Sequence, residues 1–182
     1  MIDLVRKRRS IRAYTDAPVD NETMELLVET LLRAPSSRGI NPWEFIVVND
    51  RELLTELAKA KPHGSNFFKG AALGVVICAD STKTDVWVED CSIAAILLQM
   101  TAQSLGLGSC WIQIRNRQQS RDCSSEEFIQ KVLGLPEHIK VECMVSIGHP
   151  AETRRALAAS QLQYDKVSLN RYCSRWERSG GE

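Results

Sequence analysis

Five cations within the first twelve residues form the most distinctive chemical feature of this sequence. They lie between Arg6 and Arg12 and surround Ser10. Arginine offers forked N–H donors and serine a hydroxyl group, and together these groups match the oxygens of a phosphate monoester. A solvated helix face or a nonspecific polyanion patch has a similar composition, so a phosphate site is one of three interpretations of this segment.

A second polar segment lies between residues 34 and 43, with the sequence APSSRGINPW. Two serines, one arginine and one asparagine stand here between two prolines, which restrict the backbone at each end. A planar heterocycle with carbonyl and imide edges, such as a flavin, requires this mixture of donors and acceptors. An ordinary connection from a helix to a strand has the same composition, so the loop alone does not decide between the two.

The six cysteines are dispersed along the chain and form no CxxC pair. No histidine stands at metal-ligand spacing from them. Most of these cysteines lie among apolar residues, where a free thiol behaves as a small hydrophobic side chain. We therefore expect reduced cysteines that pack in the core, no metal site, and a reducing compartment, which indicates the cytoplasm.

Composition and length limit the classes of function that need consideration. Because 23 basic side chains balance 23 acidic ones, no net charge would attract nucleic acid or an anionic membrane to the whole protein. No run of residues reaches the roughly 18 apolar positions of a membrane span. A length of 182 residues with 43% hydrophobic residues suffices for one domain, 1–182, and no internal repeat divides it.

Helices and strands are predicted to alternate along this domain. Asp20 is a suitable N-cap for the first long helix, which Pro35 would end, and Gly134 would end the last. The helices are expected over 21–34, 50–61, 84–105 and 126–133, and the strands over 43–48, 72–79, 109–114 and 141–147. The run 72–79 is continuously apolar and indicates a central strand, whereas 141–147 alternates and indicates a strand with unlike faces.

Two segments carry more apolar surface than one small domain is expected to bury. The helix over 84–105 is apolar on most of its sides, so a sheet would cover one side and a second subunit another. The tail from about residue 151 to 182 is polar and irregular but contains large apolar residues, among them Tyr172 and Trp176. We expect this tail to be a C-terminal arm that packs on a partner subunit.

Four motifs resemble the nitroreductase family in their order and spacing. They are RRSIRAY at 8–14, APSS at 34–37 closing on PWEF at 42–45, LGLGSCW at 105–111, and IGHP at 147–150. The resemblance implies an α+β fold with a central, mostly antiparallel sheet flanked by helices, and an intertwined homodimer with one FMN per subunit at the interface. It also implies an oxidoreductase that passes electrons from NADH or NADPH to a nitroaromatic or quinone-like small molecule by a ping-pong mechanism.

The resemblance also assigns roles to individual residues, with the chemistry carried by FMN and no catalytic side chain. The basic start would hold the phosphate, Arg12 would approach the pyrimidine edge, and the 35–37 loop would reach the flavin from the other subunit. The segment 110–113 would pass along the ring, and a late basic residue would complete the phosphate site. The assigned residues are Arg8, Arg9, Ser10, Arg12, Pro35, Ser36, Ser37, Asn41, Cys110, Ile112, Gln113 and Arg155.

This sequence departs from the family pattern in the loop, where many members have Asn-x-Gln-Pro-Trp and this chain has Gly39-Ile-Asn41-Pro-Trp. Two other functions remain open at this point. One is a flavin- or polyanion-binding regulatory protein without turnover, which would use the same basic start. The other is a specialised flavin-fragmenting or dehalogenating relative, which would need lid residues that this short chain lacks.

Overall fold

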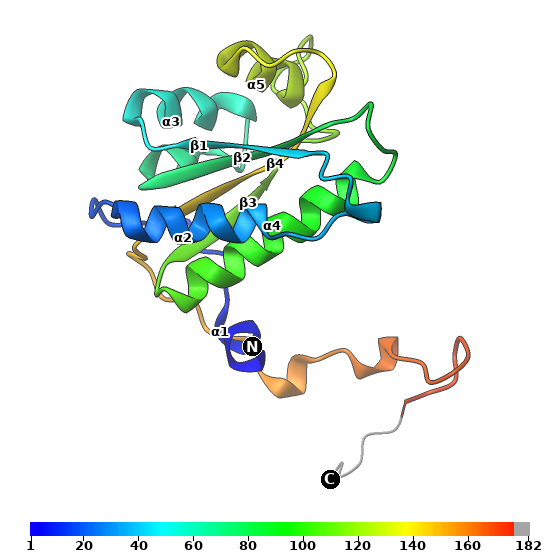
Figure 1. Cartoon of the computed structure of the whole chain (residues 1–182). Coiled ribbons are helices and arrows are strands. Elements are labelled where there is room, and N and C mark those ends of the chain that lie inside the picture. Colours follow the sequence, from blue (N-terminus) through cyan, green and yellow to red (C-terminus); the bar gives the residue numbers. More distant parts are fainter. Residues whose placement is uncertain (177–182) are drawn as a thin grey trace.

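The computed structural model describes residues 1–176 and has a four-stranded sheet at its centre (Figure 1). The strand order is β1-β2-β4-β3, and every neighbouring pair is antiparallel. The bounds are β1 Trp43–Val48, β2 Leu73–Asp80, β3 Gly108–Gln113 and β4 Ile139–Gly148. The predicted α+β class is confirmed, and no strand boundary differs from its predicted position by more than two residues.

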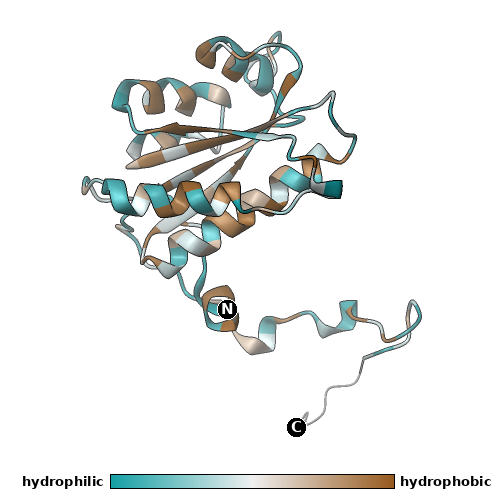
Figure 2. Ribbon diagram, in the orientation of Figure 1, coloured by the Kyte–Doolittle hydropathy of each residue, from teal (hydrophilic) through white to brown (hydrophobic). Residues whose placement is uncertain are grey.

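Helices cover both faces of this sheet, with α2 and α4 on one face and α3 and α5 on the other (Figure 1). The helices of the described residues are α1 Ile2–Lys7, α2 Asn21–Leu32, α3 Arg51–Leu57, α4 Trp87–Ser104 and α5 Ser125–Leu133. Short 3₁₀ segments are η1 Ser37–Gly39, η2 Ala58–Ala60, η3 Asn66–Gly70, η4 Ala159–Gln161 and η5 Tyr164–Lys166. The apolar strands lie between the two helical layers (Figure 2).

The helix ends follow from local sequence signals. The side chain of Asp20 accepts a hydrogen bond from the Thr23 amide at 2.7 Å and so caps α2, as predicted. Gly134 ends α5 with a left-handed φ of 68°, a conformation that glycine adopts without steric cost. The α4 prediction was three residues too long at its start, because residues 84–86 form a turn before Trp87.

Both faces of β4 are buried, although the alternation of its sequence indicated a strand with unlike faces. Glu142 is only 4% exposed and Ser146 is fully buried. The Ser146 hydroxyl bonds to the Tyr14 hydroxyl at 2.7 Å, and Glu142 Oε1 accepts from the Gln113 side-chain amide at 3.4 Å, whereas Glu142 Oε2 is buried without a hydrogen-bond partner among residues 1–176. The alternating sequence pattern therefore distinguishes two buried faces.

Four of the six cysteines are buried, as expected for packing residues, whereas Cys173 is exposed in the arm. Burial raises the pKa of the Cys78 thiol to about 12. A thiol with so high a pKa remains protonated near neutral pH and is a poor nucleophile. The buried cysteines are therefore suited to packing rather than to chemistry.

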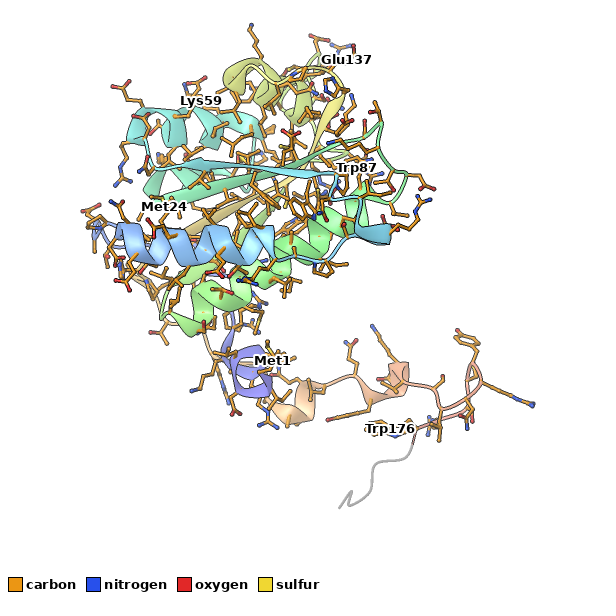
Figure 3. The ribbon with its side chains drawn as sticks, in the orientation of Figure 1. Met1, Met24, Lys59, Trp87, Glu137 and Trp176 are labelled. Carbon is orange, nitrogen blue, oxygen red and sulfur yellow. The ribbon has the colours of Figure 1, made fainter. Side chains whose placement is uncertain are left out.

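The single chain leaves apolar side chains uncovered on α4 and along the C-terminal segment. Ile93 and Ile96 of α4 are 40% and 44% exposed, and Tyr172 is 94% exposed. The segment after residue 150 extends away from the sheet, and Trp176 folds back along it so that its ring lies 5.9 Å from that of Tyr164 (Figure 3). The predicted arm thus projects from the body, although 177–182 lie outside the described residues. No helix within residues 1–176 is long and apolar enough to cross a bilayer.

Candidate functional site

The basic N-terminal segment lies along the outer edge of β3. Ser10 forms a parallel bridge with Ser109, and the Ile11 amide donates to the Ser109 carbonyl at 3.0 Å. This close approach requires Gly108, because a Cβ atom there would lie 2.8 Å from the Cβ of Ile11. The second glycine of the LGLG motif, Gly108, is therefore needed for the basic segment to contact the sheet.

Four arginines and a serine line one hollow of about 290 Å³ beside this edge. We call this the arginine hollow; its residues are Arg8, Arg9, Ser10, Arg12 and Arg154. Glu152 ties the hollow together, since its carboxylate accepts from the Arg12 amide at 2.7 Å and pairs with Arg154 at 2.7 Å. Several guanidinium donors with one hydroxyl suit a phosphate monoester, so the residues fit the phosphate end of FMN.

The structure places Arg154, and not the assigned Arg155, in the arginine hollow. Arg155 lines a neighbouring hollow together with Arg9 and residues of the arm, whereas Arg154 lines the arginine hollow itself. The two arginines are adjacent in sequence, and no local pattern distinguishes them. The salt bridge between Arg154 and Glu152 supplies the distinction, because it directs Arg154 toward the N-terminal segment.

Cys110 lies on β3 next to the arginine hollow. Burial raises the pKa of its thiol, and the nearby Arg12, Ser10 and Arg8 oppose this shift. The Arg12 guanidinium also lies 5.6 Å from the centroid of the Phe67 ring, within reach of a cation–π contact. The 3₁₀ segment η3 therefore borders the site, which the sequence motifs did not indicate.

Lys61 is a further cation near Cys110 that sequence reasoning missed. Burial lowers the pKa of its ammonium group, followed by the charge of Arg117, while Cys110 acts in the opposite direction. Its only sequence signal was its position at the end of the helix predicted over 50–61. That signal does not indicate a site.

The remaining two residues assigned on β3 have their side chains committed elsewhere. Ile112 is 1% exposed and packs in the core between the sheet and α5. The Gln113 side chain accepts from Trp111 Nε1 at 3.0 Å and donates to the Arg115 carbonyl at 3.1 Å. Any contact of these two residues with a cofactor would therefore involve the backbone.

The loop from Ser36 to Asn41, called the serine loop, has an unusual backbone. Arg38, Gly39 and Asn41 have positive φ angles of 54°, 65° and 51°. Ser36 and Asn41 close it, since the Ser36 hydroxyl donates to Asn41 Oδ1 at 2.6 Å and accepts from the Asn41 amide at 2.8 Å. Glycine and asparagine tolerate this conformation best, so Gly39 and Asn41 suit their positions in the loop.

Three residues of this region line a second hollow, called the loop hollow, of about 410 Å³. It is formed by Pro35, Ser36, Ser37, Val86, Glu89, Asp90 and Ile93. It shares no residue with the arginine hollow. The structure thus gathers most of the assigned residues into two separate groups, one at the β3 edge and one between the loop after α2 and the start of α4.

Comparison with known proteins gives a consistent result. The sequence profile of the nitroreductase family matches residues 5–76 and 59–149. A solved structure from Clostridium difficile, an FMN-dependent nitroreductase, is 45% identical, with a TM-score of 0.93 over 94% of this chain and 100% of the other. A protein of Archaeoglobus fulgidus, provisionally named NADH dehydrogenase/NAD(P)H nitroreductase, is 34% identical over 84% of this chain and 87% of its own length. An NADPH-flavin oxidoreductase of Vibrio harveyi is 27% identical over 93% and 76%.

Proposed function

The chain belongs to the nitroreductase family, and on that premise we propose that it is an FMN-dependent oxidoreductase driven by NADH or NADPH. Its electron acceptor would be an electron-poor small molecule such as a nitroaromatic or a quinone. The observation that carries this proposal is the arginine hollow, where four guanidinium groups and a hydroxyl meet in a protein without net charge. A phosphate group is the ligand that this donor set suits best.

The residues of the chain would bind and orient the cofactor, and FMN when bound supplies the two-electron chemistry. The arginine hollow would hold the phosphate, and Arg12 would hold the pyrimidine edge from its place above Phe67. Cys110 and the β3 backbone would border the ring. Because the donor and the acceptor would use the same open face in turn, we propose ping-pong kinetics.

We propose that the active form is a homodimer whose subunits each contribute one half of a flavin site. Two observations support this. The arginine hollow and the loop hollow are separate in one chain, and the exposed Ile93 of α4 lines the loop hollow. The C-terminal arm, which projects with exposed apolar side chains, would pack on the second copy. We further propose a reducing, cytoplasmic location, on the ground of the reduced thiols.

The absorbance spectrum of the purified protein tests this function. We expect a yellow protein with flavin bands that bleach under NADH or NADPH without oxygen and return when a quinone is added. Parallel lines in a double-reciprocal plot of rates against both substrates would support ping-pong kinetics. A colourless protein that binds no added FMN but is retained on heparin would instead support polyanion binding without turnover.

A further inference from the structure

We propose that Asp90 is a positioning residue that holds the serine loop in its binding conformation. This inference rests on the proposed function, in which the serine loop contacts the flavin ring. Asp90 is the fourth residue of α4 and is 3% exposed. Its Oδ1 atom accepts a hydrogen bond from the Ser37 amide at 2.8 Å, across 53 positions of sequence.

Burial of the Asp90 carboxylate costs free energy of folding, because only one of its two oxygens has a hydrogen-bond partner among residues 1–176. Its second carboxylate oxygen, Oδ2, is buried and has no hydrogen-bond partner among residues 1–176. An apolar side chain of similar size would avoid this cost, since the neighbouring Val86 and Ile93 also line the loop hollow. The Ser37 amide is the group that gains from a carboxylate here, because hydrogen bonds to charged acceptors are the stronger ones.

The serine loop needs such an anchor because its own bonds do not attach it to the body. The two bonds between Ser36 and Asn41 close the loop on itself. Left-handed Arg38 and Asn41 store strain, which persists only where the surroundings determine the conformation. The bond from Ser37 to Asp90 joins the loop to α4, which packs against the sheet. Asp90 thus holds the loop in a fixed position relative to the packed core.

Three substitutions test this role by equilibrium binding of FMN and of riboflavin. Asp90→Ala removes the acceptor, Asp90→Asn retains an acceptor oxygen without the charge, and Asp85→Asn removes an exposed charge outside the loop hollow. We expect Asp90→Ala to weaken both ligands by about tenfold, because the loop acts on the ring and not on the phosphate. Asp90→Asn should stay within about threefold of the wild type, and Asp85→Asn should match it.

The donor of the same hydrogen bond can be removed from the loop side. Ser36 has φ −136° and ψ 157°, which a following proline accepts, so Ser37→Pro removes the amide N–H at a tolerant position. If the hydrogen bond from Ser37 to Asp90 orders the loop, Ser37→Pro should weaken flavin binding when it is introduced into the wild-type protein. Introduced into Asp90→Ala, which already lacks the bond, it should weaken binding by no more than about twofold. Equal losses in both backgrounds would overturn the proposal.

Trypsin cleavage after the exposed Arg38 reports the order of the loop without any cofactor. In flavin-free protein, Asp90→Ala should be cut at Arg38 at least several times faster than wild type, Asp90→Asn and Asp85→Asn. Unchanged cleavage and unchanged flavin affinity in Asp90→Ala would refute the positioning role. The role would also be refuted if Asp90→Asn lost as much flavin affinity as Asp90→Ala and both variants had lowered melting temperatures. A wild-type protein that binds no FMN would refute the proposed function, while the cleavage assay would still decide on the anchor.

Discussion

The two groups of the proposed flavin site are built by opposite means. The arginine hollow presents cations from the N-terminal segment and from Arg154 after β4; Arg12 and Arg154 are exposed and Arg8 is half-buried. The serine loop presents a backbone of positive φ angles, anchored to the nearly fully buried Asp90. In the proposed site the first group would recognise charge and the second would recognise shape. Charge recognition depends on residues at the ligand, whereas shape recognition also depends on a residue behind the loop.

The largest expected effect separates the two ligands in the arginine hollow. Arg8→Ala should weaken FMN binding by about ten- to a hundredfold, as expected when a charge-assisted hydrogen bond of about 1.5–3 kcal/mol is lost. Riboflavin, which lacks the phosphate, should lose less than threefold. Arg6→Ala is the control, since Arg6 pairs with Asp3 on α1 outside the hollow. Equal losses of both ligands, measured by fluorescence titration, would contradict the phosphate assignment.

The next effect concerns how the arginine hollow is attached to the sheet. Gly108→Val places a side chain within 3 Å of Ile11 and should push the basic segment from β3. We expect a loss of about 1–3 kcal/mol in the free energy of unfolding, the usual cost of overpacking. FMN retention should fall with it. Gly70→Ala, where a Cβ has open space, should leave both unchanged in urea titration and spectra.

A smaller effect is expected from the strain of the serine loop. Asn41→Ala loses the bond to Ser36 and keeps a left-handed φ that alanine disfavours by about 1–2 kcal/mol. FMN and riboflavin should therefore weaken equally, by several-fold. Asn41→Gly relieves the strain but also lacks the bond to Ser36, so its flavin affinity should lie between those of Asn41→Ala and the wild type. A loss confined to FMN would show that the loop contacts the phosphate.

The smallest effect is expected at Glu142, which is a buried carboxyl group like Asp90 but lies outside both hollows. Burial raises the pKa of Glu142 above 4.5, while Gln113 and then Arg115 oppose the shift. Because the folded protein binds this proton more tightly than the unfolded chain, its contribution to stability is present below pH 4.5 and is lost as the pH rises through the folded pKa.

Glu142→Gln cannot ionise and should flatten this part of the pH dependence. We expect a gain of about 1 kcal/mol in the free energy of unfolding at pH 7, where a buried charge is removed, and no change in FMN affinity. Urea unfolding at several pH values measures the first quantity. A variant that is less stable at pH 7 than wild type would show that the charged form is the favoured one.

Much of the fold could be predicted because its signals are local. The capping residues Asp20 and Gly134, the apolar run of β2 and the alternation of β4 depend on neighbouring positions, and the structure confirms these elements. The environment of β4 was not predictable in this way. Its polar residues Glu142 and Ser146 contact Gln113 and Tyr14, which come from distant parts of the chain, so the same alternation fits one buried face or two.

For the candidate site, the sequence alone determined the chemical types and the proposed ligand class. A cluster of arginines with a serine is compatible with a phosphate site, and the four motifs that resemble the nitroreductase family favoured this interpretation over a solvated face or a polyanion patch. Only the tertiary structure decided that Arg154 lines the hollow with Arg8, that Gly108 faces Ile11, and that Asp90 anchors Ser37. These contacts join residues that are far apart in sequence. Packing of helices on the sheet creates them, and no local periodicity records them.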